Sequence, residues 1–200
     1  MEYLLVIVLI VIVYFYLKSK KNIDTSAVPK QFIVFDLETT GLNSNQHEII
    51  EIGAIKVNRD SNEHQTFQAL IKSKKKIPVK ITEITNITQE MLDKDGEDIE
   101  NVLKDFLEFI GDLRLVAYNS DFDMSFLRKA AKEQNIKINN SVSCALKMSR
   151  RAWKDLDSYK LADIAKMGGF STKGSHRALK DCEMALIVYT SAAHVLNLDH

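Results

Sequence analysis

The sequence predicts an α/β domain whose mixed β-sheet is flanked by helices, preceded by one N-terminal transmembrane helix. Three observations lead to this fold class. An uninterrupted apolar run opens the chain, strand-like segments follow one another from residue 31 to residue 73, and from residue 98 onwards helical periodicity alternates with a strand-like run. Strands that first adjoin and then alternate with helices are typical of a sheet covered by helices.

Length and composition set the first limits on fold and partners. A chain of 200 residues suits one domain with a substantial core. The 27 basic residues balance the 27 acidic ones, which excludes a globally cationic nucleic-acid binder but allows local basic surfaces. Cys144 and Cys182 are the only cysteines. Their spacing indicates neither a zinc site nor a disulfide framework, so a reducing compartment fits best.

The first 17 residues are predicted to form a membrane anchor. Tyr3 to Leu17 contains no charged residue, and Lys18, Lys20 and Lys21 follow at once. The length is near the lower end of the roughly 17 to 25 residues that span a bilayer. Lysines on the downstream side place the rest of the protein in the cytoplasm. The alternative is a buried helix or strand of the folded domain, which the lack of polar interruption makes the poorer interpretation.

A polar tether is expected to separate the anchor from the folded domain. Residues 18–29 are polar, contain Pro29 and show no sustained periodicity. The folded domain is therefore expected to occupy residues 30–200.

Three consecutive strands are expected at the start of that domain. Gln31 to Leu42 begins with an apolar run, and His47–Asn58 and His64–Ser73 read as the two arms of a hairpin. Residues 74–95 contain lysines, Pro78 and short apolar pieces, which favour short helices and turns.

Helices dominate the remainder of the predicted domain. Apolar residues recur at three and four positions between residues 98 and 110, which indicates an amphipathic helix. A strand at 114–118 and a helix at 122–135 follow. The last third is expected to be helical, over residues 143–153, 158–167 and 177–196, with Gly168 and Gly169 ending the second of these helices.

Two carboxylates stand at the end of the first predicted strand. Side chains two residues apart on a strand share a face, so Asp36 and Glu38 are expected side by side, roughly 7 Å apart along the chain. Two such groups repel each other unless a cation lies between them, so divalent metal ions are their natural partner. The alternative is a strand that simply emerges into a polar Thr39-Thr40-Gly41 turn.

Two further acidic motifs follow. Asn119 or Ser120 could cap the helix that starts after the strand at 114–118, leaving Asp121 or Asp123 in its first turn. His176 precedes Asp181 by five residues, which is about 140° of rotation on a helix, so both cannot share one helix face. His176 is therefore expected in a loop or first turn, and Asp181 on the helix itself.

The segment from residue 141 to residue 180 is locally basic, with nine basic and three acidic residues. Such a surface attracts a phosphate backbone. Solvated helix faces explain scattered lysines and arginines equally well, and both interpretations stay open.

Three motifs together resemble the DnaQ-like, or DEDDh, family of 3′-to-5′ exonucleases. FDLETTGL is similar to the first family motif, AYNSDFDMSFL to the second and SHRALKDCEMA to the third, in the same order. The resemblance extends from about Gln31 to Val195 and implies a ribonuclease-H-like fold. Tyr118 stands where the family often has His, and Asn86 where it often has Gly. Asn tolerates a left-handed backbone, so the second departure is mild.

The resemblance assigns roles to individual residues. It resolves the ambiguity of the second motif in favour of Asp123 and implies that His176 is the general base. The metal-binding and catalytic acids it implies are Asp36, Glu38, Asp123 and Asp181, and the residues implied to hold the terminal nucleotide are Thr39, Thr40, Leu42 and Asn119.

The implied reaction is two-metal phosphodiester hydrolysis with Mg²⁺ or Mn²⁺, in which His176 takes a proton from the attacking water. The expected substrates are 3′ ends of single-stranded nucleic acid, DNA favoured over RNA, and the expected products are nucleoside 5′-monophosphates. Short RNA is the alternative substrate, and an inactive nuclease-like binding module at the membrane is the alternative function. Any association with a polymerase or repair complex would be between chains, and the sequence does not determine it.

Overall fold

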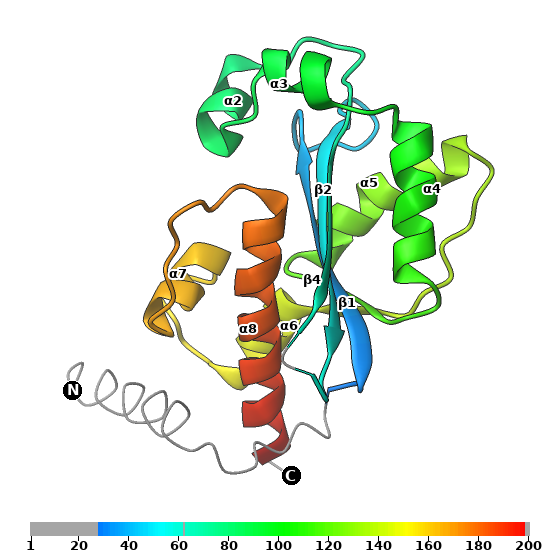
Figure 1. The fold of residues 1–200 in the computed structure, drawn as a ribbon. Coiled ribbons are helices and arrows are strands. Elements are labelled where there is room, and N and C mark those ends of the chain that lie inside the picture. Colours follow the sequence, from blue (N-terminus) through cyan, green and yellow to red (C-terminus); the bar gives the residue numbers. More distant parts are fainter. Residues whose placement is uncertain (1–27, 62, 199–200) are drawn as a thin grey trace.

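The computed structural model describes residues 28–61 and 63–198. Five strands form one sheet in the order β3-β2-β1-β4-β5 (Figure 1). Antiparallel pairs join β1 to β2 and β2 to β3, whereas β4 lies parallel to both β1 and β5. The predicted mixed sheet is therefore confirmed. The strands are β1 (Gln31–Thr39), β2 (Ile49–Asn58), β3 (Gln65–Leu70), β4 (Leu115–Ala117) and β5 (Val142–Cys144).

Helices cover both faces of this sheet, with α8 on one face and α4 and α5 on the other (Figure 1). The short helices α2 and α3 follow β3 in the region predicted to contain short helices and turns. The helices are α2 (Val79–Thr85), α3 (Gln89–Asp95), α4 (Ile99–Ile110), α5 (Ser120–Glu133), α6 (Ala145–Ala152), α7 (Leu161–Met167) and α8 (Ala178–Leu198).

The central strand β1 divides its side chains between two cores. Ile33, Phe35 and Leu37 pack in the core that includes α4 and α5, whereas Phe32 and Val34 pack in the core that includes α8. A strand covered on both faces is apolar at consecutive positions, which explains the run that opens the domain. The alternation continues past the apolar run, so the next even-numbered side chains of β1 also emerge on the α8 face.

Helix α8 approaches β2 closely at Gly53. A Cβ atom on Gly53 would lie 2.5 Å from the backbone carbonyl carbon of Ala178 and 2.5 Å from the amide nitrogen of Leu179. The Cys182 thiol donates a hydrogen bond to the Gly53 carbonyl at 3.3 Å. Gly53 is also the partner of Asp36 in the β1–β2 register. Because Gly53 has no side chain, the first turns of α8 can lie next to the carboxyl end of β1.

One strand differs from the sequence prediction. Val142–Cys144 forms β5, parallel to β4, where the sequence indicated the beginning of a helix at residue 143. Three residues are too short for strand periodicity to be distinguished from the first turn of a helix. Pairing with β4 decides the conformation, since the Leu115 N–H donates to the Ser141 carbonyl at 2.8 Å.

The transmembrane part of the predicted fold class is corrected. Across residues 28–61 and 63–198, no helix combines the length and the apolar character that a bilayer span requires. The longest of these helices, α8, carries Lys180, Asp181 and Glu183 in its first turns. The predicted anchor at residues 1–17 and most of the tether lie outside the described residues. The single-pass membrane localisation and the membrane partner inferred from that span are withdrawn with it.

Replacing Gly53 with Ala tests the close approach of α8. The added Cβ meets backbone atoms that cannot move alone, so we expect Gly53→Ala to lower the free energy of unfolding by about 1–3 kcal/mol, measured by urea denaturation. Gly168→Ala is the control, because its Cβ would first meet the movable Phe170 ring, at 3.2 Å. Equal effects of the two substitutions would contradict the tight α8–β2 contact.

Candidate active site

Acidic side chains from three elements converge at the carboxyl end of β1. Carboxylate oxygens of Asp36, Glu38 and Asp181 all lie within 4.8 Å of one another. Asp123, only 3% exposed, joins them from the first turn of α5, which begins just after β4. Parallel strands β1 and β4 end at the same edge of the sheet, so the α5 amino end and the β1 carboxylates meet there.

His176 and Asp181 are linked through the backbone of the loop that precedes α8. The His176 N–H donates to the Asp181 Oδ1 at 3.1 Å, and α8 begins two residues after His176, at Ala178. His176 has a φ of 63°, and its side chain is exposed. A positive φ on a residue with a side chain persists only where neighbours fix it. The expected division, His176 in the loop and Asp181 on the helix, is confirmed.

Burial, and after it the charge of neighbouring acids, raises the pKa of these acids. Burial, then the charge of Asp123 and of the other neighbouring acids, raises the pKa of Asp36 well above its ordinary value. Burial and the charge of Asp181 raise the pKa of Glu38 from 4.5 to about 8. Burial also raises the pKa of Asp123 to about 7, although backbone hydrogen bonds from Asp123 itself and Leu37 act in the opposite direction. The pKa of Asp181 is likewise raised, chiefly by burial.

This donor set fits a hard divalent cation. All the ligand atoms are carboxylate oxygens, which favour Mg²⁺, Mn²⁺ or Ca²⁺ over zinc. Positive charge at the centre of the cluster would stabilise the ionised form of acids whose pKa is raised by burial and by neighbouring negative charge. The site can therefore hold divalent cations.

Glu51 is a site residue that the sequence interpretation missed. It is fully buried on β2, directly opposite Glu38 in the strand register. Its carboxylate accepts hydrogen bonds from the Arg177 guanidinium at 2.7 Å, from the Ala178 N–H at 2.9 Å and from the Gln68 side-chain amide at 2.9 Å. Glu51 thereby fixes the residues immediately after His176 to the middle of the sheet.

The signal for Glu51 was present in the sequence. A lone acid between apolar neighbours in IIEIGAI must be buried if the strand is covered on both faces, and a buried acid needs partners. Two of those partners, Arg177 and Ala178, are more than 120 positions away, and only the folded chain identifies them.

Of the four residues implied to hold the terminal nucleotide, two are hydrogen-bonded within the turn after β1 and two are exposed on the surface. The Thr39 hydroxyl donates to the Gly41 carbonyl at 2.7 Å, and the Thr40 hydroxyl accepts from the Glu48 N–H at 3.0 Å. Both threonines thus stabilise the turn that follows β1. Leu42 is 86% exposed, and Asn119 is exposed immediately before α5.

The two departures from the family motifs have structural explanations. Asn86 ends α2 with a φ of 58°, as its tolerance of a left-handed backbone suggested. The Tyr118 hydroxyl donates a hydrogen bond to the Tyr159 carbonyl, which directs this side chain toward the segment before α7.

The exonuclease family model RNase_T matches residues 33–189. This chain belongs to that exonuclease family. The assignment confirms the resemblance to the DnaQ-like exonucleases with a ribonuclease-H-like fold.

Relatives and solved structures agree with this family. The chain is 38% identical to a DNA polymerase III PolC-type protein of Caldanaerobacter subterraneus subsp. tengcongensis, over 80% of this chain and 11% of that protein. It is 36% identical to a DNA polymerase III subunit epsilon of Aquifex aeolicus, over 79% of this chain and 78% of the subunit. This chain thus spans about a tenth of the length of these PolC-type relatives.

Two solved structures share the fold of this exonuclease-family chain. An E. coli exonuclease I complex with single-stranded DNA superposes with a TM-score of 0.68 at 16% identity, covering 86% of this chain and 41% of the other. Exonuclease X in complex with 5′-overhanging duplex DNA superposes with a TM-score of 0.61 at 24% identity, covering 84% and 90%.

The raised carboxylate pKa values predict a link between pH, metal and stability. A group with a raised folded pKa stabilises the folded state fully below its unfolded pKa and loses that contribution as the pH rises through the folded pKa. For Glu38 and Asp123 this stabilising contribution is lost between about pH 4 and about pH 8. The metal-free protein should therefore have a lower melting temperature at about pH 8 than at about pH 6.

Added Mn²⁺ should raise the melting temperature more at about pH 8, because protons compete less for the ligands there. Glu38→Gln removes one of the titrating groups, so the pH dependence without metal should weaken in this variant. Identical Mn²⁺ stabilisation at both pH values would contradict the proton competition.

Glu51→Gln should loosen the start of α8. The amide cannot accept the Arg177 guanidinium on both oxygens, so we expect a loss of about 2 kcal/mol in the free energy of unfolding. Glu183→Gln is the matched control, because Glu183 pairs with Lys180 at 2.6 Å on the surface and should contribute less than about 1 kcal/mol. Urea denaturation of both metal-free variants makes the comparison, and equal losses would rule out the anchoring role.

Proposed function

We propose that this chain is a metal-dependent 3′-to-5′ exonuclease that releases nucleoside 5′-monophosphates from single-stranded DNA. The observation that supports this most directly is the cluster of four acids with His176 tied to one of them, Asp181, through a backbone hydrogen bond. A module that only binds nucleic acid has no chemical need for an exposed imidazole beside four buried acids. The PolC-type and epsilon relatives are named as DNA polymerase III proteins, which favours DNA over RNA.

The proposed mechanism assigns a task to each side chain. Asp36, Glu38, Asp123 and Asp181 hold two divalent cations, Mg²⁺ or Mn²⁺. When bound, the cations supply positive charge against the scissile phosphate and make water a better nucleophile. His176 accepts the proton of the attacking water. An imidazole nitrogen is suited to accept this proton, and the exposure of His176 lets the proton pass on to solvent.

The terminal nucleotide is proposed to lie between the turn after β1 and the amino end of α5. Leu42 offers an exposed apolar contact for a base, and Asn119 offers amide donors and acceptors from the other side. Thr39 and Thr40 contribute by shaping the turn, since their hydroxyls already have partners in it. No contact in this set selects deoxyribose over ribose, so short RNA is tested beside DNA.

A nuclease assay tests the proposed function. The full chain is given 5′-labelled single-stranded DNA and RNA of equal sequence, with Mg²⁺, Mn²⁺ or EDTA. We expect a ladder that shortens from the 3′ end, release of 5′-monophosphates, and no reaction in EDTA. His176→Ala should lower kcat by about 10²- to 10⁴-fold, because it removes the proton acceptor while the acids remain.

Two variants make the assay specific. Asp123→Asn should abolish cleavage, and Asp105→Asn, an exposed acid on α4, should leave it unchanged. Binding of the strand without cleavage under every metal would overturn the enzyme in favour of an inactive binding module. Faster cleavage of RNA than of DNA would reverse the proposed substrate preference.

A further inference from the structure

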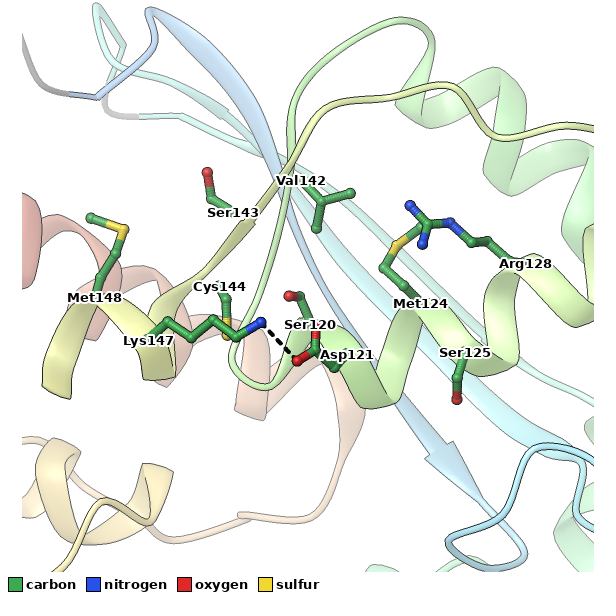
Figure 2. A pocket seen from close by; sticks show the side chains of 10 residues that line it. All are labelled: Ser120, Asp121, Met124, Ser125, Arg128, Val142, Ser143, Cys144, Lys147 and Met148. Carbon is green, nitrogen blue, oxygen red and sulfur yellow. Dashed lines mark hydrogen bonds and ion pairs between the residues drawn. The ribbon is translucent and has the colours of Figure 1, made fainter.

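A cavity of about 570 Å³ lies between α5, β5 and α6. Figure 2 shows Arg128 and Lys147 reaching in from α5 and α6, with Met124 and Val142 between them. We call this cavity the α5–α6 pocket. Its lining residues are Ser120, Asp121, Met124, Ser125, Arg128, Val142, Ser143, Cys144, Lys147 and Met148.

The α5–α6 pocket is separate from the carboxylate cluster, although both use α5. At 100° per residue, the five α5 residues that line the pocket fall within an arc of about 140° on the helix. Asp123 lies about 130° from the middle of that arc, on the side that joins the other acids. A ligand in the pocket would therefore contact α5 without touching the metal-binding side chains.

Among the charged residues that line the pocket, one cationic side chain is available to bind an anion. The Lys147 Nζ lies 2.7 Å from the Asp121 Oδ2, so these two exposed groups neutralise each other. Arg128 is exposed, and its guanidinium has no hydrogen bond or ion pair to any residue in the described part of the chain. The Arg114 guanidinium reaches the same edge of the sheet, where it donates to the Ser143 hydroxyl at 3.2 Å.

We propose that the α5–α6 pocket binds single-stranded nucleic acid upstream of the 3′ end that is being hydrolysed. This inference rests on the proposed function and adds a second contact to the same substrate. Arg128 contacts a backbone phosphate, the Ser143 hydroxyl donates to a phosphate oxygen, and the half-buried Val142 side chain lies against a base. None of these groups reads a base edge, so the contact is independent of sequence.

The location of the pocket favours a nucleic-acid strand over an acidic peptide. Its first lining residue, Ser120, directly follows Asn119, which is proposed to hold the terminal nucleotide. A strand whose end lies at the amino end of α5 reaches the pocket by passing around the first turn of that helix. Residues 141–180, which carry nine basic and three acidic residues, supply β5 and α6 on the far side. The strand thus continues toward a locally basic segment of the chain.

The dependence of cleavage on salt tests this contact. For single strands, each phosphate contact contributes about 0.7 to the slope of log affinity against log salt. Arg128→Gln should reduce the slope of log kcat/KM against log salt by about 0.7 on a strand of about ten nucleotides. It should leave the slope on a dinucleotide unchanged, since a dinucleotide cannot occupy both sites. Arg128→Lys should restore most of the lost slope.

Asp121→Asn gives a prediction of opposite sign. Removing the carboxylate frees Lys147, so the salt slope on the longer strand should increase by about 0.7. Lys104→Gln on α4 is the control for loss of an exposed positive charge and should change neither slope. Melting temperatures should be the same for Arg128→Gln and the unaltered chain, because Arg128 has no partner within the described residues.

The dinucleotide separates failure of this inference from failure of the proposed function. Absence of cleavage on both substrates would overturn the exonuclease itself. Normal dinucleotide cleavage, with an unchanged salt slope for Arg128→Gln and Asp121→Asn on the longer strand, would overturn only the pocket contact. In that event an acidic peptide would be the ligand that fits the same groups.

Discussion

Repulsion among buried carboxylates is the constraint on which the rest of the structure depends. Four acids that would separate in a flexible chain are held together at one end of the sheet, where burial first, and neighbouring negative charge second, raise their pKa values. The free-energy cost of burying these acids close together must be offset by other interactions in the fold. Glu51, a fifth buried acid, shows how a buried carboxylate is stabilised, because it accepts hydrogen bonds from Arg177, Ala178 and Gln68. One acid on the same face is thus structural, while its neighbours stay available for cations.

Two packing features bring the acids together. The alternation of β1 sends Asp36 and Glu38 to the α8 face, after apolar side chains have fixed that strand in both cores. Gly53 then allows α8 to come close enough for Asp181 to meet them. The same loop that starts α8 presents His176, whose backbone is fixed by Asp181 while its side chain faces solvent. The proximity of His176 to the acids is therefore a consequence of helix packing.

Sequence interpretation succeeded where a signal was long or periodic. The hairpin of β2 and β3, the amphipathic α4 and the long α8 were predicted because each repeats its pattern over several residues. It failed at β5, which is too short to show a period, and at the transmembrane assignment, for which the described part of the chain contains no suitable helix. Glu51 was missed because its importance lies in partners distant along the chain.

The sequence by itself determined the family, the mixed α/β sheet and the identity of the acids and histidine that form the candidate site, since local motifs and strand alternation carry that information. Only the tertiary structure decided that Glu51 anchors α8, that Thr39 and Thr40 use their hydroxyls within the turn, and that a cationic pocket lies on the other side of α5 from Asp123. The Glu51 contacts join elements far apart in the chain, and no local pattern encodes which distant side chain will satisfy a buried charge.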